Sequence, residues 1–189
     1  MWGIRGVSLA VLVAALCFVG LCFVGPLAAQ QTGPAGLPTA ESASGQRVGA
    51  STGLPLPRFA SVRASEAKLR IGPGLRYPTE WVYRLRNMPV EIIEEFDAWR
   101  KVRDWEGTEG WMHQSLLAGQ RTVIIMAEET ILRREPDEQA AGLARFQRGL
   151  IARLEACRDS WCAVSARGYR GWLPRTTVYG VFAEEVFGG

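Results

Sequence analysis

The chain has 189 residues with 22 basic and 19 acidic side chains, so its formal net charge at pH 7 is only +3. Because acidic residues are interspersed among the basic ones, the sequence argues against a nucleic-acid-binding protein, which needs a basic face. The 21 glycines, 10 prolines and 7 tryptophans favour a small all-β protein, since turns and large aromatic side chains suit such folds.

The first residues have the order of a secretory signal peptide. One cation, Arg5, precedes an uncharged apolar run over residues 7–24, and small residues follow up to Ala29. We therefore predict that residues 1–29 direct export to the periplasm. Because the run is as long as a short membrane span, an uncleaved inner-membrane anchor facing the periplasm remains open, and so does a buried core helix. The protein would contact a membrane only if this segment is not cleaved.

Residues 30–57 differ abruptly in composition. They are rich in Gly, Ser, Thr, Ala and Pro and contain no aromatic side chain. Such a segment cannot bury enough apolar area to offset its ordering entropy. We predict a flexible linker between the export segment and the folded part.

From Arg58 onward, short β-prone runs alternate with turn signals. Two of them, residues 90–96 and 99–105, are separated by a tight turn at Asp97-Ala98, and further runs follow at similar spacing. Short strands at such spacing are typical of small barrels or sandwiches.

The second half of this region repeats the first. Three groups of residues match in order, at offsets that fall from 63 to 61 along the chain: Leu69-Arg70 with Leu132-Arg133, Trp99 with Trp161, and Gly110-Trp111 with Gly171-Trp172. A period of about 60 residues is too long for a solenoid repeat and suits two whole small domains. We therefore predict a first domain at residues 58–121 and a second at residues 122–182.

These motifs resemble the bacterial SH3 domain family. The segments that carry the resemblance are LRIGPG from Leu69, GTEGWMHQSLL from Gly107, DSWCAV from Asp159 and GYRGWLPRTTVYG from Gly168. The resemblance implies two tandem small SH3-like β-barrels, with a strand starting at each Gly-Trp pair and a short helical turn after it. It also implies a binding module for peptidoglycan or for a peptide or protein of the cell envelope.

Cys157 and Cys162 flank a turn signal in the central hairpin of the second copy. Cysteines so placed can face each other across two strands, and export would put them in an oxidising compartment. We predict a disulfide, with two free thiols as the alternative. In the first copy we expect hydrophobic packing by Phe96 at the equivalent place.

Neither a metal site nor another cofactor is predicted. A structural zinc ion needs about four protein ligands. The mature chain offers only two cysteines and the single remote His113. Nothing marks a nucleophile elbow around the neighbouring Ser115, so we interpret His113 as structural and the protein as non-enzymatic. A small cell-wall hydrolase is the enzymatic alternative. The adjacent carboxylates Glu94-Glu95 and Glu128-Glu129 would point to opposite strand faces, and we interpret them as solvated charges.

The aromatic side chains are the remaining candidates. The tryptophans that both copies share are expected in the core: Trp99, Trp111, Trp161 and Trp172. Aromatic residues that lack clear partners in the second copy, together with nearby arginines, are better binding candidates, because the shared fold does not require them. We predict a ligand-binding site at Tyr77, Trp81, Tyr83, Trp105, Arg70 and Arg76.

Two physical arguments support this predicted site. Tyr77 follows the loop Gly72-Pro73-Gly74, and aromatic-lined grooves hold extended peptides, while arginine pairs well with acidic groups. Ordinary partial burial of the aromatics and a solvated arginine face are the alternatives. Glu135 and Asp137 replace the two glycines in the second copy, which puts a groove built from that loop in doubt there.

Overall fold

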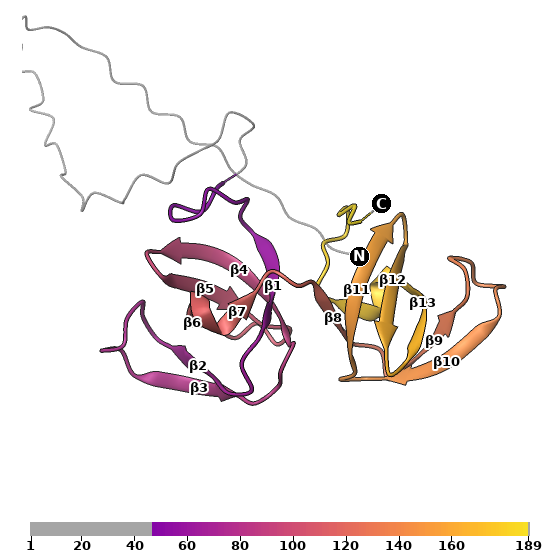
Figure 1. Ribbon diagram of the computed structural model, residues 1–189, viewed down its shortest axis with the longest axis horizontal. Coiled ribbons are helices and arrows are strands. Elements are labelled where there is room, and N and C mark those ends of the chain that lie inside the picture. Colours follow the sequence, from indigo (N-terminus) through magenta and orange to yellow (C-terminus); the bar gives the residue numbers. More distant parts are fainter. Residues whose placement is uncertain (1–46, 189) are drawn as a thin grey trace, which may run out of the picture. The chain divides into compact units, whose positions relative to one another are not determined.

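The structure is a computed structural model and describes residues 47–188, so the predicted export segment and residues 30–46 of the predicted linker lie outside the described residues. Two antiparallel sheets account for nearly all of the described secondary structure. Figure 1 draws the first sheet in indigo to pink and the second in orange to yellow.

The first sheet contains seven strands. They are β1 (Arg58–Val62), β2 (Ala67–Arg70), β3 (Thr79–Tyr83), β4 (Pro89–Phe96), β5 (Trp99–Arg103), β6 (Glu109–His113) and β7 (Leu117–Ala118), with the short 3₁₀ helix η1 (Gln114–Leu116) before β7. Their order in the sheet is β3-β2-β6-β5-β4-β1-β7. We call this unit the first barrel.

The second sheet repeats this arrangement strand by strand. It contains β8 (Thr122–Ile125), β9 (Glu129–Arg133), β10 (Gly142–Gln147), β11 (Ile151–Arg158), β12 (Trp161–Ala166), β13 (Tyr169–Pro174) and β14 (Val178–Tyr179), with the 3₁₀ helix η2 (Arg175–Thr177) before β14. The order β10-β9-β13-β12-β11-β8-β14 matches that of the first sheet element by element. The prediction of an all-β fold with two tandem SH3-like units is thereby confirmed, and we call the second unit the second barrel.

The Gly-Trp motif owes its glycine to a close strand crossing. A Cβ atom at Gly110 would collide with the Leu69 side chain of β2, and one at Gly171 would collide with the Arg133 carbonyl of β9. Each glycine therefore lets β6 or β13 pair with the preceding edge hairpin, which brings Trp111 opposite Arg70.

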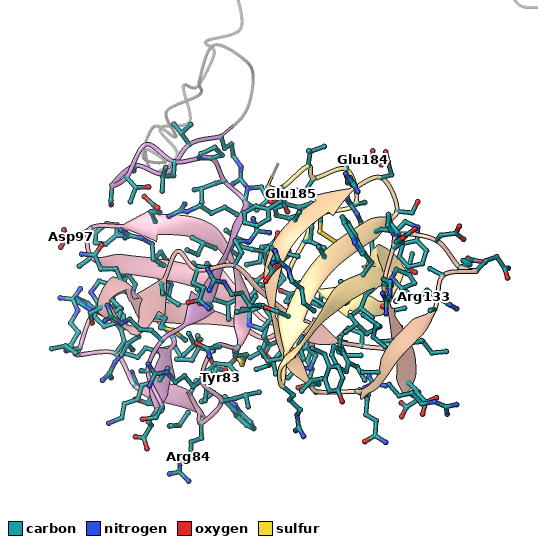
Figure 2. The ribbon with its side chains drawn as sticks, turned by 45° about the vertical axis from the view of Figure 1, so that its right-hand side comes forward. Tyr83, Arg84, Asp97, Arg133, Glu184 and Glu185 are labelled. Atoms are coloured by element: carbon teal, nitrogen blue, oxygen red, sulfur yellow. A yellow bond between two sulfur atoms is a disulfide. The ribbon has the colours of Figure 1, made fainter. Side chains whose placement is uncertain are left out.

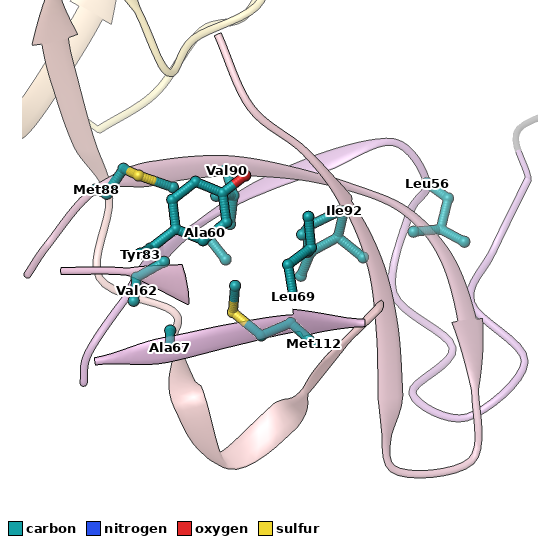
Figure 3. Close-up of a cluster of buried hydrophobic side chains, with 11 residues drawn as sticks. Leu56, Ala60, Val62, Ala67, Leu69, Tyr83, Met88, Val90, Ile92 and Met112 are labelled. Atoms are coloured by element: carbon teal, nitrogen blue, oxygen red, sulfur yellow. The ribbon is translucent and has the colours of Figure 1, made fainter. Parts of the chain in front are cut away.

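Each barrel encloses its own hydrophobic core. The first core, shown in Figure 3, consists of Leu56, Ala60, Val62, Ala67, Leu69, Tyr83, Met88, Val90, Ile92, Val102 and Met112. The second consists of Val123, Ile125, Leu132, Phe146, Ala152, Leu154, Cys157, Cys162, Val164 and Leu173.

Of the four tryptophans expected in these cores, only Trp99 is buried. Trp99 is buried but belongs to neither core cluster, and Trp111, Trp161 and Trp172 are only half-buried. Strand alternation explains the difference for the Gly-Trp motifs, because the next residue, Met112 or Leu173, is the one that faces the core.

The central hairpins of the two barrels superimpose in register but differ in chemistry at one cross-strand pair. In β4 and β5 Glu95 lies opposite Arg100, and at the same register of β11 and β12 Cys157 lies opposite Cys162. Both pairs adjoin a tight turn whose first residue, Asp97 or Asp159, has φ near +49°, a conformation that Asp tolerates well. The cysteines form a disulfide, as predicted.

The buried carboxylate of Glu95 takes the place of that disulfide in the first barrel. Its side chain is inaccessible to solvent and accepts hydrogen bonds from Arg58 at 2.5 Å and from the Thr52 hydroxyl at 2.8 Å, with the Arg100 guanidinium 3.5 Å away. Glu95 is therefore not the solvated charge that its sequence position suggested. Phe96, expected to fill this place, is 48% exposed and corresponds to Arg158.

Glu95 also fixes residues 47–57, which we call the N-terminal strap. The backbone N–H groups of Ser51 and Thr52 donate to its carboxylate at 3.1 and 3.0 Å, and Leu56 enters the first core. A side chain at Gly49 would overlap the carboxylate, so glycine is required at this approach. The strap falls within the predicted linker, yet two of its backbone N–H groups are held by one buried charge and others by hydrogen bonds within the strap.

The second barrel is closed at the equivalent hairpin by the residues that follow β14. Phe187 pairs with Cys157 through two backbone hydrogen bonds of 2.7 and 3.1 Å and packs against the second core. Glu185, labelled in Figure 2, forms an ion pair with Arg121 at 2.5 Å. The second unit therefore extends beyond the predicted boundary at residue 182.

Replacing Glu95 by glutamine should destabilise the first barrel by about 3 kcal/mol, because it leaves the charges of Arg58 and Arg100 without their buried partner. Burial raises the pKa of Glu95, but hydrogen bonds from Arg58 and Thr52 and the nearby guanidinium charges outweigh burial and hold this pKa below its usual range. The stabilisation is thus present above the ordinary glutamate pKa of about 4.3 and lost as the pH falls through the lower folded-state pKa.

Chemical denaturation from about pH 3 to about pH 7, a range that includes the ordinary glutamate pKa, measures this effect. The Glu95→Gln variant should show a weaker acid dependence than the parent protein. The exposed neighbour provides the control, since Glu94→Gln should change stability by less than about 0.5 kcal/mol. Equal effects at the two positions would contradict the assignment of Glu95 as the buried anchor.

Removing the disulfide with Cys157→Ala and Cys162→Ala should destabilise the second barrel by about 2 kcal/mol, at the low end for disulfides because the closed loop is short. Hydrogen exchange resolved by barrel is the measurement. Faster exchange should be confined to β11, β12 and the residues around Phe187. Uniform loss of protection in both barrels would show that the bond does not act locally.

Candidate functional site

A groove opens beside Trp99 on the first barrel, and we call it the first groove. Strand β2 contributes Lys68 and Arg70, the β2–β3 loop contributes Leu75, and η1 contributes Leu116. Its volume is about 640 Å³, and its full lining is Glu66, Lys68, Arg70, Leu75, Trp99, His113, Ser115 and Leu116. The walls are mainly apolar and the charged groups stand on one side, as is common in ligand pockets.

The second barrel has a groove at the corresponding place, which we call the second groove. It has a volume of about 540 Å³ and is lined by Glu129, Thr130, Ile131, Arg133, Glu138, Gln139, Trp161 and Pro174. Trp161 lies opposite Pro174 across two strands just as Trp99 lies opposite His113. The fold therefore creates the same hollow twice and lines it with different side chains.

One arginine shapes the loop at the edge of each groove. Arg70 donates from Nη1 to the backbone carbonyls of Tyr77 at 2.7 Å and Leu75 at 3.3 Å. Arg133, labelled in Figure 2, donates in the same way to the carbonyl of Ala140 at 2.8 Å. The loop conformation is thus set by a charged hydrogen bond from the groove floor rather than by the loop sequence alone.

His113 caps the short helix that forms the far side of the first groove. Its Nδ1 accepts from the Ser115 backbone N–H at 3.2 Å and lies 2.7 Å from the Ser115 hydroxyl, and its ring meets Trp99 edge-on at 5.4 Å. A serine–histidine contact also occurs in catalytic triads, where a third group orients the imidazole. Among the described residues no carboxylate hydrogen-bonds to His113, so the contact acts as a helix cap.

The residues predicted to bind ligand do not gather in one place. Arg70 lines the first groove, whereas Trp81 is 58% exposed on β3 outside its lining. The Tyr77 ring packs over Gly72 in the loop, with the Arg76 guanidinium 5.1 Å from its centre.

Two of the predicted binding residues contact the first core. Tyr83 is buried and donates from its hydroxyl to Asp104 at 2.8 Å; its side chain points into the first core in Figure 3. Burial and this hydrogen bond raise the pKa of Tyr83. Trp105 packs against the same core.

Sequence reasoning overlooked Lys68, Leu75 and Leu116. One signal was present, because Lys68 and Arg70 alternate with the buried Ala67 and Leu69 on β2, which places both cations on one outer face. The convergence of that face with Leu116 from η1 depends on β6 crossing to pair with β2, which no local pattern reveals.

The family comparison agrees with this duplicated geometry. The model for the bacterial SH3 domain matches the chain twice, at residues 63–119 and 126–180, which together make up more than half of it. The chain belongs to the bacterial SH3 domain family. The two matches begin directly after the first strand of each barrel, β1 or β8, and contain all lining residues of both grooves.

Other comparisons add little to this assignment. No curated protein matches the chain. Among solved structures, NlpC2 from Trichomonas vaginalis is similar at 13% identity and a TM-score of 0.31, covering 65% of this chain and 48% of that one. NlpC1 from the same organism gives 14%, 0.32, 69% and 48%. The chain spans about half the length of these two proteins, and similarity at this level supports no statement about activity.

The described residues contain neither a helix long and apolar enough to cross a membrane nor a group of three or more side chains suited to hold a metal ion. The established features of the chain are the bacterial SH3 fold, its two tandem copies and one disulfide.

Replacing Tyr83 by phenylalanine should destabilise the first barrel by about 1–3 kcal/mol, because one oxygen of the buried Asp104 loses its donor. Thermal or chemical denaturation measures the change. Tyr77→Phe is the matched control and should be near neutral, since the Tyr77 hydroxyl meets only the exposed Arg76 at 3.3 Å. The opposite ranking would show that the hydrogen bond between Tyr83 and Asp104 does not stabilise the first barrel.

Proposed function

We propose that the protein is a non-catalytic, exported binding module that docks to peptidoglycan, with a peptide segment of a cell-envelope protein as the alternative ligand. The observation that carries this proposal is the first groove, a hollow of about 640 Å³ whose lining combines the apolar Leu75, Trp99 and Leu116 with the cations Lys68 and Arg70. Such a groove suits an extended ligand that presents apolar and polar groups in alternation. Family membership supports the ligand class by analogy only.

Export is supported by two independent features. Residues 1–29 have the charge and hydropathy order of a secretory signal, and the Cys157–Cys162 disulfide is typical of an oxidising compartment. N-terminal sequencing of the mature protein tests both forms of this proposal. A start near residue 30 indicates a cleaved signal, whereas an intact N-terminus indicates an inner-membrane anchor.

Blocking the first groove should abolish docking. Ser115 is exposed on η1 at the groove wall, so Ser115→Trp fills the hollow without disturbing the first core. We expect purified peptidoglycan to retain the parent protein. The affinity of the variant for peptidoglycan should be lower by at least about tenfold, the equivalent of one or two lost contacts. Co-sedimentation at several ligand concentrations measures this.

The second barrel offers the matched control. Thr176 occupies the place of Ser115 on η2, is also exposed, and does not line the second groove. Thr176→Trp should therefore leave retention unchanged. Equal loss in both variants would exclude the first groove as the docking site, and absence of retention for the parent protein would favour a protein partner.

The same samples test the hydrolase alternative, for which the contact between His113 and Ser115 is the supporting geometry within residues 47–188. We expect no soluble wall fragments after prolonged incubation. Release of fragments by the parent protein that disappears in His113→Ala would establish catalysis and overturn the non-enzymatic assignment.

A further inference from the structure

The two grooves share their framework and differ at two exposed positions. The arginine on the strand and the tryptophan across from it occur in both, as Arg70 with Trp99 and as Arg133 with Trp161. The strand residue two places before the arginine is Lys68 in the first groove and Ile131 in the second. The loop residue five places after it is Leu75 in the first and Glu138 in the second.

These two differences give the grooves opposite charge. In the first groove no carboxylate of the described residues lies within 4 Å of Lys68 or Arg70, and Glu66 is engaged by Arg84 at 3.6 Å. Only Nη1 of Arg70 makes hydrogen bonds within the described residues, so its remaining N–H groups are free to contact a ligand. Two cations without a carboxylate partner thus stand beside an apolar wall.

The second groove lacks this arrangement. Ile131 removes the cation next to the arginine, and Glu138 adds a carboxylate where the first groove has an exposed leucine. Glu129 corresponds to Glu66 of the first groove and is likewise paired with an arginine, Arg145 at 3.2 Å, so Glu138 is the carboxylate that distinguishes the second groove. A ligand carboxylate would meet like charges there, which disfavours binding.

Resting on the proposed function, we propose that the first groove, and not the second, selects an extended ligand in which a carboxylate directly follows an apolar side chain. Lys68 and the free N–H groups of Arg70 contact the carboxylate, and Leu75, Trp99 and Leu116 contact the apolar group. The partner is thus a carboxylate-bearing peptide, and the charge of one wall sets the preference between the two copies of the fold.

A pair of small peptides tests this selectivity on the full mature protein. The probes are N-acetylated Ala-Leu-Ala-Leu with a free C-terminal carboxylate and the same peptide as its C-terminal amide. We expect the carboxylate form to bind about tenfold more tightly, as one charge-assisted hydrogen bond warrants. Indole N–H shifts in ¹H–¹⁵N NMR spectra should change at Trp99 and not at Trp161.

Exchanging the differing residues between the grooves provides matched variants. Lys68→Ile with Leu75→Glu gives the first groove the side chains of the second and should abolish the preference for the carboxylate form. Ile131→Lys with Glu138→Leu should add a carboxylate-dependent response at the Trp161 signal while the Trp99 response stays, a gain that misfolding cannot produce. All four positions are exposed, so the folds should persist.

Several results would overturn the inference. They are equal affinity for acid and amide, binding of neither, a response at Trp161 in the parent protein, or exchange variants that behave as the parent does. Failure here is distinguishable from failure of the proposed function. Suppose that Ser115→Trp abolishes peptidoglycan retention and that the exchange variants do not change it. The proposed docking would then stand, and only the carboxylate selection would be refuted.

Discussion

The cross-strand pair beside the turn of the central hairpin is the interaction on which each barrel depends. The hairpins β4–β5 and β11–β12 have the same register and the same bulge, and each carries an ionic or covalent cross-strand link one pair away from its turn. One copy uses the charge of Glu95 and the other uses a covalent bond between Cys157 and Cys162. The two solutions share a position but not a chemistry, and each also binds the segment that closes its barrel.

The choice of chemistry extends to neighbouring positions. The first barrel buries a second polar pair, Tyr83 with Asp104, whereas the second has Phe146 in its core at the place of Tyr83. Buried polar groups stabilise a fold only if every one of them is satisfied, so the first barrel requires the N-terminal strap to complete the hydrogen bonding of Glu95. The second barrel has a more apolar interior and is closed through backbone pairing with Phe187 instead.

Much of the fold could be predicted from the sequence, because strand alternation, turn residues and the repeated Gly-Trp pairs are local signals. The burial of Glu95 could not, since its partners Thr52 and Arg58 lie about 40 residues away in the chain and one of them falls in a segment of linker-like composition. Of the predicted site residues, Arg70 alone belongs to the lining of the first groove. Tyr77, Tyr83 and Trp105 were singled out because the second copy lacks clear partners for them, but absence from one copy equally marks residues that replace core contacts.

The arginine that holds each loop has a consequence for how such a module diversifies. Because Arg70 and Arg133 hold the loop through its carbonyl oxygens, this part of the loop conformation does not depend on the side chains at the exposed loop positions. Exposed positions such as Leu75 and Glu138 can therefore change without disturbing the scaffold. Duplication of such a unit gives one chain two grooves, and the exposed lining of each groove can change independently of the other.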